Sequence, residues 1–185
     1  MDIGCTRGVI LLFLQSIGCS NLFGIDLGPY MKERLRDPSL FEAHFGDLPP
    51  RITFYQVDVD TERLPFDNAA LDLVIMTDVI EHLYYPDRVL EECRRTLRTG
   101  GVLFIRTPNA VDLKRRILTF NGRTAYPDLD AWLAPKVKLQ KGVSDRRFHL
   151  HIREYTMGEL ELLLRYYGFK PILKKIPCPY CCNGI

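Results

Sequence analysis

The sequence predicts a doubly wound α/β fold, in which helices cover both faces of a parallel sheet. Short apolar runs alternate with helical patterns along the 185 residues, and this alternation is typical of a parallel sheet built from strand–helix units. The run 71–77 is almost continuously apolar, as expected for a strand that is buried on both faces. Several runs end in an aspartate, so carboxylates are expected to gather at one edge of the sheet.

The chain opens with a short strand over 1–3, a turn and a helix. Gly4 and Gly8 bracket the turn, and an apolar helical pattern follows over 9–14. Glycine lets the backbone adopt positive φ and lets a ligand approach closely. The unpaired N–H groups of a helix N-terminus favour an anionic group. These features predict a ligand-binding turn, although an ordinary strand–turn–helix has the same pattern.

The remaining elements follow in chain order. We expect a strand over 21–26, a helix near 29–36, and strands over 52–58, 71–77 and 102–105. A helix over 86–97 is expected to be closed by Gly100 and Gly101. A helix over 154–167, with Gly168 as its C-cap, precedes a last strand over 169–176. The first strand and the C-terminal strand are short for this architecture, so we expect both to be truncated.

Length and composition limit the class of protein. The chain is long enough for one domain over 1–185 with a sizeable core. Its net charge of +2 predicts neither a nucleic-acid partner nor a membrane partner. No apolar run reaches the roughly 18 residues that span a bilayer, and no signal-peptide pattern is present. We expect a cytoplasmic protein, and the sequence leaves its oligomeric state open.

The cysteines favour a reducing compartment over a disulfide framework. Three of the six cysteines fall in predicted core elements, which suits free thiols. The tail contains a C-x-x-C between Cys178 and Cys181. A structural zinc site needs about four ligands, and no second pair lies near. We therefore expect no metal site there.

Acidic residues end the first four predicted strands, at Asp2, Asp26, Asp58 and Thr77-Asp78. In open α/β sheets, ligands bind beyond the carboxyl ends of the strands. Carboxylates there suit a ligand with amino, sulfonium and ribose hydroxyl groups, and they would repel a phosphorylated ligand. This distribution favours S-adenosylmethionine over a dinucleotide. The spacing of Gly4 and Gly8 also departs from the dinucleotide fingerprint G-x-G-x-x-G.

The segment 2–8, D-I-G-C-T-R-G, resembles the first motif of the class I S-adenosylmethionine-dependent methyltransferases, usually (D/E)-x-G-x-G-x-G. Asp2, Gly4 and Gly8 match, whereas Thr6 replaces the middle glycine and fits if its φ is negative. The segments L-D-L-V-I at 71–75 and D-V-I-E-H-L at 78–83 resemble F-D-x-V and E-H-(L/V) of the type 11/12 and quinone methyltransferases. The resemblance spans roughly 2–176 and implies a Rossmann-like methyltransferase sheet.

The resemblance also implies a cofactor site. Asp2 would lie near the methionine amino group, and the turn residues Gly4, Thr6 and Gly8 near the methionine portion. Asp26, followed by Leu27, would accept hydrogen bonds from the ribose hydroxyls; a helix N-cap is its alternative role. Asp58 and Val59 would contact the adenine, and Asp60 is the alternative acid for this role. Alternatively, Asp58 is only a carboxylate that stabilises a turn. Thr77 and Asp78 would complete the site.

His82 is the candidate catalytic residue. A neutral imidazole near the methyl-transfer path can take a hydroxyl proton; alternatively, His82 only lines the pocket. Asp78-x-x-Glu81-His82 is similar to the E-x-x-E-H cluster that binds a divalent cation in some quinone O-methyltransferases, so metal assistance stays open. His149 and His151 would face one side of an extended segment, either toward an acceptor or on a plain surface.

The segment 109–153 breaks the strand–helix rhythm and is expected to be an acceptor-binding lid. This segment contains ten basic and four acidic residues, which give a net charge of +6, and aromatic residues lie between them in the sequence. The sequence thus predicts a methyltransferase that acts on a small-molecule, anionic acceptor; the alternative for the charge is a solvated surface. A binding protein without turnover is the first alternative function, and a dinucleotide-dependent oxidoreductase the second. No N/D-P-P-Y/F motif supports a nucleic-acid methyltransferase.

Overall fold

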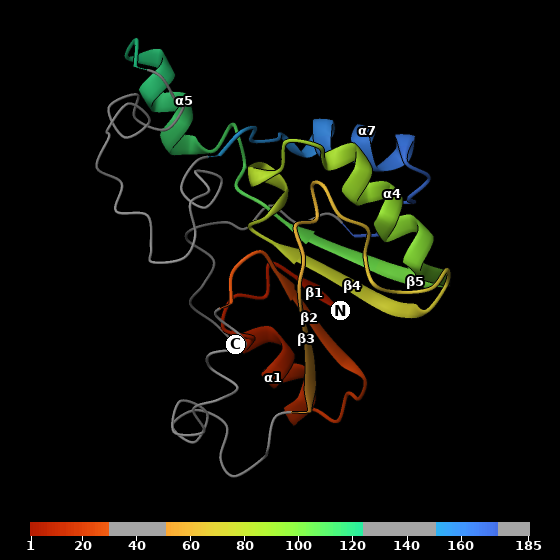
Figure 1. Ribbon diagram of the computed structural model, residues 1–185. Coiled ribbons are helices and arrows are strands. Elements are labelled where there is room, and N and C mark those ends of the chain that lie inside the picture. Colours follow the sequence, from red (N-terminus) through yellow and green to blue (C-terminus); the bar gives the residue numbers. More distant parts are fainter. Residues whose placement is uncertain (30–50, 124–150, 174–185) are drawn as a thin grey trace.

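The computed structural model describes residues 1–29, 51–123 and 151–173. Its strands form one parallel sheet in the order β3-β2-β1-β4-β5 (Figure 1). The chain winds outward from β1 to β3 on one side and from β4 to β5 on the other. The strands are β1 (Asp2–Ile3), β2 (Leu22–Asp26), β3 (Ile52–Gln56), β4 (Leu71–Thr77) and β5 (Leu97–Arg106).

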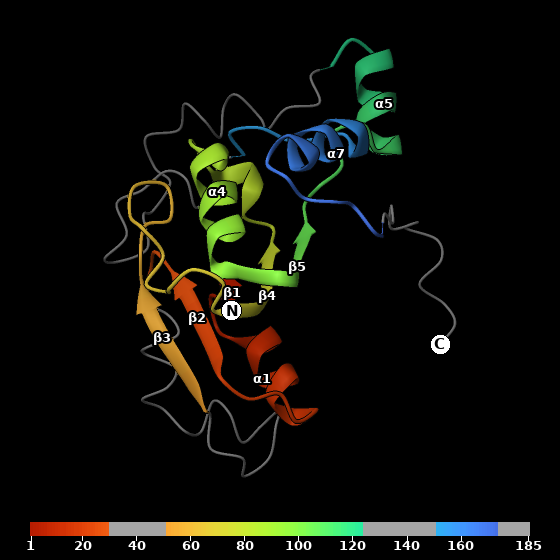
Figure 2. The same ribbon diagram turned by 90° about the vertical axis from the view of Figure 1, so that its right-hand side faces the viewer.

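Helices cover both faces of this sheet, as predicted. Figures 1 and 2 show α1 on one face and α4 with α7 on the other. No helix among the described residues is long and apolar enough to cross a membrane. The helices are α1 (Val9–Ser16), the 3₁₀ turn η1 (Ile80–His82), α4 (Pro86–Thr96), α5 (Leu113–Phe120) and α7 (Met157–Tyr166).

Side chains that point alternately to the two faces of the sheet form a separate hydrophobic cluster on each face. In β2, Leu22 packs with Cys5 and Leu11 on the α1 face, whereas Ile25 belongs to the larger cluster on the α4 face. Successive side chains of a strand point to opposite faces, so each strand serves both clusters. Two of the cysteines expected in the core, Cys5 and Cys93, are buried, but Cys19 is exposed.

The glycine pair Gly100-Gly101 lies inside β5 and does not close the preceding helix. Helix α4 already ends at Thr96, and Leu97 pairs with Leu71 of β4. The register then shifts, so that the next pair is Leu73 with Val102. Gly100 has a φ of 77° in this irregular stretch. A Cβ on Gly101 would come within 2.9 Å of the Arg98 carbonyl oxygen. The pair therefore serves a β-bulge.

The C-terminal helix starts later than predicted because a capping box sets its first residue. The Thr156 hydroxyl accepts from the Glu159 backbone N–H, and the Glu159 carboxylate accepts from the Thr156 N–H. Helix α7 therefore begins at Met157 and not at residue 154. Gly168 follows it with a φ of 79°, as expected for a helix-terminating glycine.

The predicted strand over 169–176 is wrong for its described part. Residues 169–173 form no strand, and Ile172 is 79% exposed. Pro171 has no backbone N–H to donate to a sheet ladder. The predicted helix near 29–36 lies almost entirely outside the described residues, as do His149 and the cysteines of the tail.

The described part of the segment 109–153 holds a helix that the sequence did not predict. The Asp112 side chain accepts from the Arg115 backbone N–H and caps α5. Ahead of this helix, Asn109 forms an isolated bridge to Tyr155, and the Ala110 N–H donates to the Tyr155 carbonyl at 3.0 Å. The start of the segment is thereby joined to Tyr155, two residues beyond its end.

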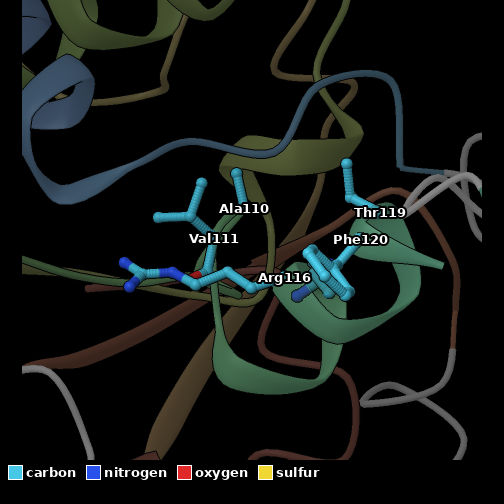
Figure 3. A pocket seen from close by; sticks show the side chains of 6 residues that line it. Ala110, Val111, Arg116, Thr119 and Phe120 are labelled. Carbon is cyan, nitrogen blue, oxygen red and sulfur yellow. The ribbon is translucent and has the colours of Figure 1, made fainter. Parts of the chain in front are cut away.

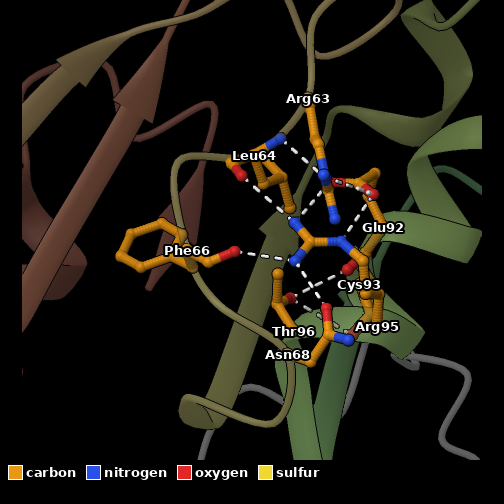
Figure 4. Close-up of polar contacts among 8 residues, drawn as sticks. All are labelled: Arg63, Leu64, Phe66, Asn68, Glu92, Cys93, Arg95 and Thr96. Atoms are coloured by element: carbon orange, nitrogen blue, oxygen red, sulfur yellow. Dashed lines mark hydrogen bonds and ion pairs between the residues drawn. The ribbon is translucent and has the colours of Figure 1, made fainter.

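A half-buried arginine fixes the loop between β3 and β4 onto α4 (Figure 4). Arg95 donates to the carbonyls of Leu64 and Phe66 at 3.1 and 2.7 Å, and to both carboxylate oxygens of Glu92 at 2.7 Å. The hydrogen bonds from Arg95 are the main cause that lowers the pKa of Glu92. Only 17% of the Arg95 side chain is exposed, so these bonds are well shielded from water.

We predict that Arg95→Met lowers the free energy of unfolding by about 2–3 kcal/mol, because the Leu64 and Phe66 carbonyls and the Glu92 carboxylate lose the hydrogen bonds that Arg95 donates. Urea unfolding followed by circular dichroism measures the change. Arg98→Met is the control: its ion pair with Asp72 is exposed on both sides, so it should lose less than about 1 kcal/mol. Equal losses would contradict the assignment.

Candidate active site

A cavity of about 220 Å³ opens beyond the carboxyl ends of β1, β2, β3 and β4. It lies where the winding of the sheet reverses between β1 and β4, which is the usual ligand position in such sheets. Its walls are formed by Ile3, Gly4, Thr6, Ile25, Asp26, Leu27, Val57, Asp58, Val59, Asp60, Asp78, Val79, His82 and Leu83.

The structure brings eight of the eleven predicted site residues to this cavity: Gly4, Thr6, Asp26, Leu27, Asp58, Val59, Asp78 and His82. The other three, Asp2, Gly8 and Thr77, do not line it. Gly8 sits at the N-cap of α1 with a φ of 69°, so its role is to let the chain enter the helix. Thr77 ends β4, and its hydroxyl has no hydrogen-bond partner among the described residues.

Gly4 is the position at which the glycine turn requires a glycine. Its φ is 71°, a left-handed value that L side chains rarely adopt. A Cβ at Gly4 would lie 2.3 Å from Val79 Cγ2, far inside van der Waals contact. The backbone of the turn after β1 therefore contacts the Val79 side chain in the turn after β4.

Thr6 adopts a positive φ of 42°, contrary to the negative value that we expected. This conformation directs the Thr6 N–H to Asp26 Oδ2 at 2.8 Å. One charge-assisted hydrogen bond offsets part of the strain of a threonine in this region. The threonine side chain is exposed at the wall of the cavity.

Asp26 is buried, with 4% exposure, yet its carboxylate is well supplied with donors. The Thr6 N–H donates to Oδ2 at 2.8 Å and the Gly28 N–H donates to Oδ1 at 2.9 Å. Burial raises the pKa of Asp26, and these backbone hydrogen bonds work in the opposite direction. The carboxylate thus holds the Thr6 and Gly28 backbone in place and also lines the cavity.

Asp2 lies behind the cavity wall, with 3% exposure. Burial raises the pKa of Asp2 to about 7, and the negative charge of Asp26 acts in the same direction. A cation in the neighbouring cavity would lower the electrostatic cost of ionising both acids. This pair therefore makes the floor of the cavity favourable to a positively charged ligand.

Asp58 and Asp60, the two candidate adenine readers, have different roles in the structure. Asp60 is 1% exposed, and its carboxylate accepts from the Tyr84 and Tyr85 N–H groups at 3.2 and 2.9 Å. It therefore anchors the turn between η1 and α4. Asp58 is half-buried at the cavity wall. This contrast favours Asp58 as the residue that faces a ligand.

Asp78 marks a strained turn at the end of β4. Its φ is 52°, its N–H donates to the Arg106 carbonyl at 2.8 Å, and its carboxylate pairs with the Arg106 side chain at 3.4 Å. Strained non-glycine residues often cluster at functional sites. The side chain of Asp78 is 46% exposed, so it forms the outer rim of the cavity.

Glu81, His82 and His151 meet on the far side of the cavity from Asp26. Each offers one ligating atom, and these atoms lie within 4.8 Å of one another. Glu81 is fully buried: the Thr107 hydroxyl donates to its Oε2 at 2.8 Å, and its Oε1 has no hydrogen-bond partner among the described residues. Histidine and carboxylate donors suit a divalent metal.

Residues that no local sequence pattern marks complete this region. Glu154 Oε1 lies 2.5 Å from both His151 Nδ1 and Arg115 Nη2. Arg115 and Glu154 are 39 residues apart in the chain, so neither spacing nor periodicity could have linked them. Val79 and Leu83, which also line the cavity, belong to the predicted 78–83 motif but were not assigned a role.

A second hollow lies along α5, which follows the carboxyl end of β5 (Figure 3). It encloses about 400 Å³ and is lined by Ala110, Val111, Arg115, Arg116, Thr119 and Phe120. Phe120 is 92% exposed. The hollow has no acid or histidine on its wall, so it offers no group for proton transfer.

Fold and cavity together define the class of protein. The chain matches the family described as "Methyltransferase domain" over residues 1–105, which is more than half of its length. The chain belongs to this family, the class I S-adenosylmethionine-dependent methyltransferases, and S-adenosylmethionine is the family's cofactor.

Curated relatives agree with this membership. A probable S-adenosylmethionine-dependent methyltransferase of Mycolicibacterium smegmatis is 30% identical over 156 residues, which cover 83% of this chain and 50% of the relative. A probable enzyme of the same description from Mycobacterium tuberculosis is 33% identical over 155 residues, covering 82% and 46%. A ubiquinone biosynthesis O-methyltransferase of Nitrosococcus oceani is 32% identical over 110 residues, covering 59% and 43%. The chain spans about half the length of these relatives.

Solved structures confirm the fold. A chain in the complex between a methyltransferase activator and a putative methyltransferase of Haloferax volcanii superposes with a TM-score of 0.61 at 20% identity, covering 90% of this chain and 59% of that one. A SAM-dependent methyltransferase of Thermotoga maritima gives a TM-score of 0.60 at 18% identity, covering 92% and 62%. At these identities the likeness concerns the fold alone.

We predict that Gly4→Ala destabilises the protein more than Gly18→Ala. Both glycines have positive φ, of 71° and 92°, but only Gly4 has a neighbour that a Cβ would strike. Backbone strain of about 1–3 kcal/mol is common to both variants, and Gly4→Ala adds the collision with Val79. Chemical unfolding measures the difference. The double variant Gly4→Ala/Val79→Ala should recover the added part; equal losses for the two single variants would refute the assignment.

Proposed function

We propose that this chain transfers the methyl group of S-adenosylmethionine to a small-molecule, anionic acceptor, as one domain over 1–185. The observation that carries the proposal is the Asp26 carboxylate on the cavity wall. The backbone N–H groups of Thr6 and Gly28 donate to its two oxygens, and a backbone hydrogen bond from Leu27 also acts on it. An ionised carboxylate has about four lone-pair sites, so Asp26 can still accept from a ribose hydroxyl, whereas a phosphate would be repelled.

The residues along the cavity fit the rest of the cofactor. Gly4 and Thr6 present the narrow backbone turn to the methionine portion, and Val79 closes the space that a Cβ would need. The buried acids Asp2 and Asp26 suit the positive amino and sulfonium groups. Asp58 and Val59 lie at the cavity wall beyond β3, where an adenine amino group would find an acceptor.

Methyl transfer requires little of the protein besides the alignment of the acceptor with the methyl group. Bound S-adenosylmethionine supplies a methyl group on a positively charged sulfur, which is an activated leaving group. The chain holds the acceptor in line with that methyl group, and proximity of this kind can supply much of the rate enhancement. The attacking oxygen or nitrogen still has a proton to lose, and the side chain nearest the acceptor side is His82.

His82 is proposed as the general base. It lines the cavity, follows directly after the buried Glu81, and stands in η1 across from the Asp26 wall. A neutral imidazole in this position accepts a proton at neutral pH. The competing role, a wall of the cofactor pocket, predicts an effect on cofactor binding alone.

The segment 109–153 is proposed as the acceptor lid. Its start is bridged to Tyr155, two residues beyond its end. At its end, the Ile152 and Arg153 N–H groups donate to the carbonyl of Glu81, the residue before His82. Its net charge of +6 contrasts with the acidic cofactor wall, so an acceptor with a carboxylate or phosphate group would be attracted to the basic side. Free thiols at Cys5, Cys19 and Cys93 suit the reducing cytoplasm.

The ribose assignment predicts that Asp26→Ala weakens the binding of S-adenosylhomocysteine by about 1.5–3 kcal/mol for each charge-assisted hydrogen bond lost. Isothermal titration calorimetry measures the affinity. Asp26→Asn, which keeps one acceptor oxygen, separates loss of the ribose contacts from loss of the turn. Asp72→Ala, an exposed acid of β4, is the control. Unchanged affinity in a folded Asp26→Ala variant would disprove the assignment.

The base assignment predicts that His82→Ala lowers kcat by about 10²–10⁴-fold. Steady-state kinetics with saturating cofactor test this statement. An unchanged kcat with a raised KM for the cofactor would make His82 a pocket wall.

The charge of the lid predicts the acceptor class. A screen of small phenols and amines with radiolabelled S-adenosylmethionine should favour members that carry a carboxylate or phosphate. Arg146→Glu/Arg147→Glu should then lower kcat/KM and weaken its dependence on salt, since opposite charges attract through the solvent. Arg88→Glu/Arg94→Glu, an equal charge change on the exposed side of α4, should have no such effect. A preference for neutral or cationic acceptors would overturn the proposal.

A further inference from the structure

Helix α5 carries an exposed apolar stripe. Leu113, Ile117 and Phe120 are 61%, 52% and 92% exposed. They are four and three residues apart, so at about 3.6 residues per turn they lie on one face of the helix. No residue of α5 is buried, and Figures 1 and 2 both show this helix at the outer edge of the molecule, away from the sheet. The stripe is therefore available to a partner outside the fold.

Basic residues flank this stripe on both sides. Lys114 and Arg116 fall on opposite flanks of it, because successive residues of a helix are about 100° apart around its axis. Both are exposed, and neither forms an ion pair with another described residue. Arg123, just beyond the helix, is exposed as well. The stretch 111–123 contains four basic residues and one acid, a local excess of positive charge that the net charge of the whole chain conceals.

Arg115, on the opposite side of the helix, fixes α5 to the body of the protein. Its side chain is only 18% exposed and pairs with the carboxylates of Asp112 and Glu154. It also donates to the Asn109 carbonyl at 2.8 Å. Asp112, the one acid of the stretch, is therefore already paired. Because the inner side of the helix is held in this way, the apolar stripe and its two flanking cations are directed away from the body.

We propose that α5 docks the protein onto a membrane surface that is rich in anionic lipids. Leu113, Ile117 and Phe120 enter the boundary between headgroups and acyl chains, while Lys114 and Arg116 lie at the lipid phosphates. Apolar burial and attraction to anionic lipids together determine how strongly such a helix binds. The eight residues of α5 rise about 12 Å, so the helix lies on the bilayer and does not cross it.

Charge favours a lipid surface over a second copy of this chain. A symmetric dimer through α5 would place the same patch of each copy against the other, so the cations of one stripe would lie against those of its partner and repel them. An anionic bilayer instead offers phosphates on both sides of the stripe. The hollow beside α5, which Val111, Arg116 and Phe120 help to line (Figure 3), extends this apolar and basic surface. The inference is independent of methyl transfer.

Co-sedimentation of the full chain with lipid vesicles tests the docking. The protein should partition onto vesicles of phosphatidylcholine and phosphatidylglycerol at least about 10-fold more strongly than onto phosphatidylcholine alone, because each exposed basic residue near an anionic surface contributes about fivefold. Added salt should weaken the binding, since it screens this attraction. Failure to bind the anionic vesicles, or equal binding to both kinds, would refute the docking.

Two substitutions in the stripe locate the binding on α5. Leu113→Ser/Phe120→Ser should lower the partition coefficient at least about 10-fold, because it removes most of the apolar area that the bilayer would bury. Phe13→Ser/Ile17→Ser is the matched control on α1, where the two side chains are 56% and 61% exposed on the other face of the sheet. Circular dichroism verifies that all variants are folded. An equal loss in the control would show that α5 is not the docking element.

Two further substitutions isolate the part played by charge. Lys114→Gln/Arg116→Gln should weaken binding to the anionic vesicles about 20–30-fold, at about fivefold for each residue, and should leave binding to phosphatidylcholine unchanged. Arg88→Gln/Arg94→Gln, which removes two exposed cations from α4, is the control and should have little effect. The same loss from both pairs would mean that overall charge, and not α5, draws the protein to the vesicles.

Sedimentation velocity without lipid tests the competing occupant of the stripe. The docking predicts the same oligomeric state for the unmodified protein and for Leu113→Ser/Phe120→Ser; a dimer that dissociates in the variant would assign the stripe to a second copy of this chain. Binding of S-adenosylhomocysteine should be unchanged in all of these variants, because α5 does not line the cofactor cavity. The vesicle assay needs no cofactor and the calorimetry needs no vesicles, so failure of the docking and failure of the proposed function are distinguishable.

Discussion

The contact between Gly4 and Val79 is the constraint on which the active site depends. Strand β1 pairs with its neighbours over only two residues, Asp2 and Ile3, and the turn that follows is held to β2 by the Gly4 and Cys5 N–H groups, which donate to the Ile25 carbonyl. The missing Cβ at Gly4 lets the Val79 side chain close on the turn. This contact locks the ends of β1 and β4 together at the point where the sheet reverses its winding, and the cavity opens directly above it.

Two buried carboxylates give this junction its chemical character. Asp2 and Asp26 lie in adjacent strands with almost no exposure, and burial raises the pKa of each. An uncompensated buried charge is costly, so the structure braces Asp26 with two backbone N–H groups. The ammonium group of Met1 acts against the rise in the pKa of Asp2. The arrangement gains most from a cation bound nearby, and this electrostatic preference distinguishes the cavity from a phosphate site.

Local patterns explain how much of the fold the sequence could predict. The run 71–77 coincides with β4, because a strand buried on both faces leaves an unbroken apolar signal. The strand over 169–176 failed, because apolar residues around Pro171 have the composition of a strand without its backbone donors. Gly100 and Gly101 were misassigned, since a helix end and a β-bulge use glycine for the same freedom of φ.

The candidate site, like the fold, could be predicted from the sequence only where it is built from local patterns. The cofactor wall comes from short turns that follow strands, so Asp26, Asp58 and the glycine turn were visible in the sequence. The acceptor side comes from contacts between distant segments: Thr107 with Glu81, Asn109 with Tyr155, and Arg115 with Glu154. Such pairings between distant segments produce no periodic pattern in the sequence. His151 was visible only as a histidine in an extended segment, and its partner Glu154 was not visible at all.

This division suits a family that keeps one cofactor and serves many acceptors. Turns next to the strands are fixed by the core, so the cofactor wall is held by the same contacts that stabilise the sheet. The proposed acceptor side is joined to the sheet by hydrogen bonds to the Glu81 and Tyr155 carbonyls. In this chain, those bonds bring His151, with its partner Glu154, beside His82, so the contacts that shape this side are separate from those that hold the cofactor wall.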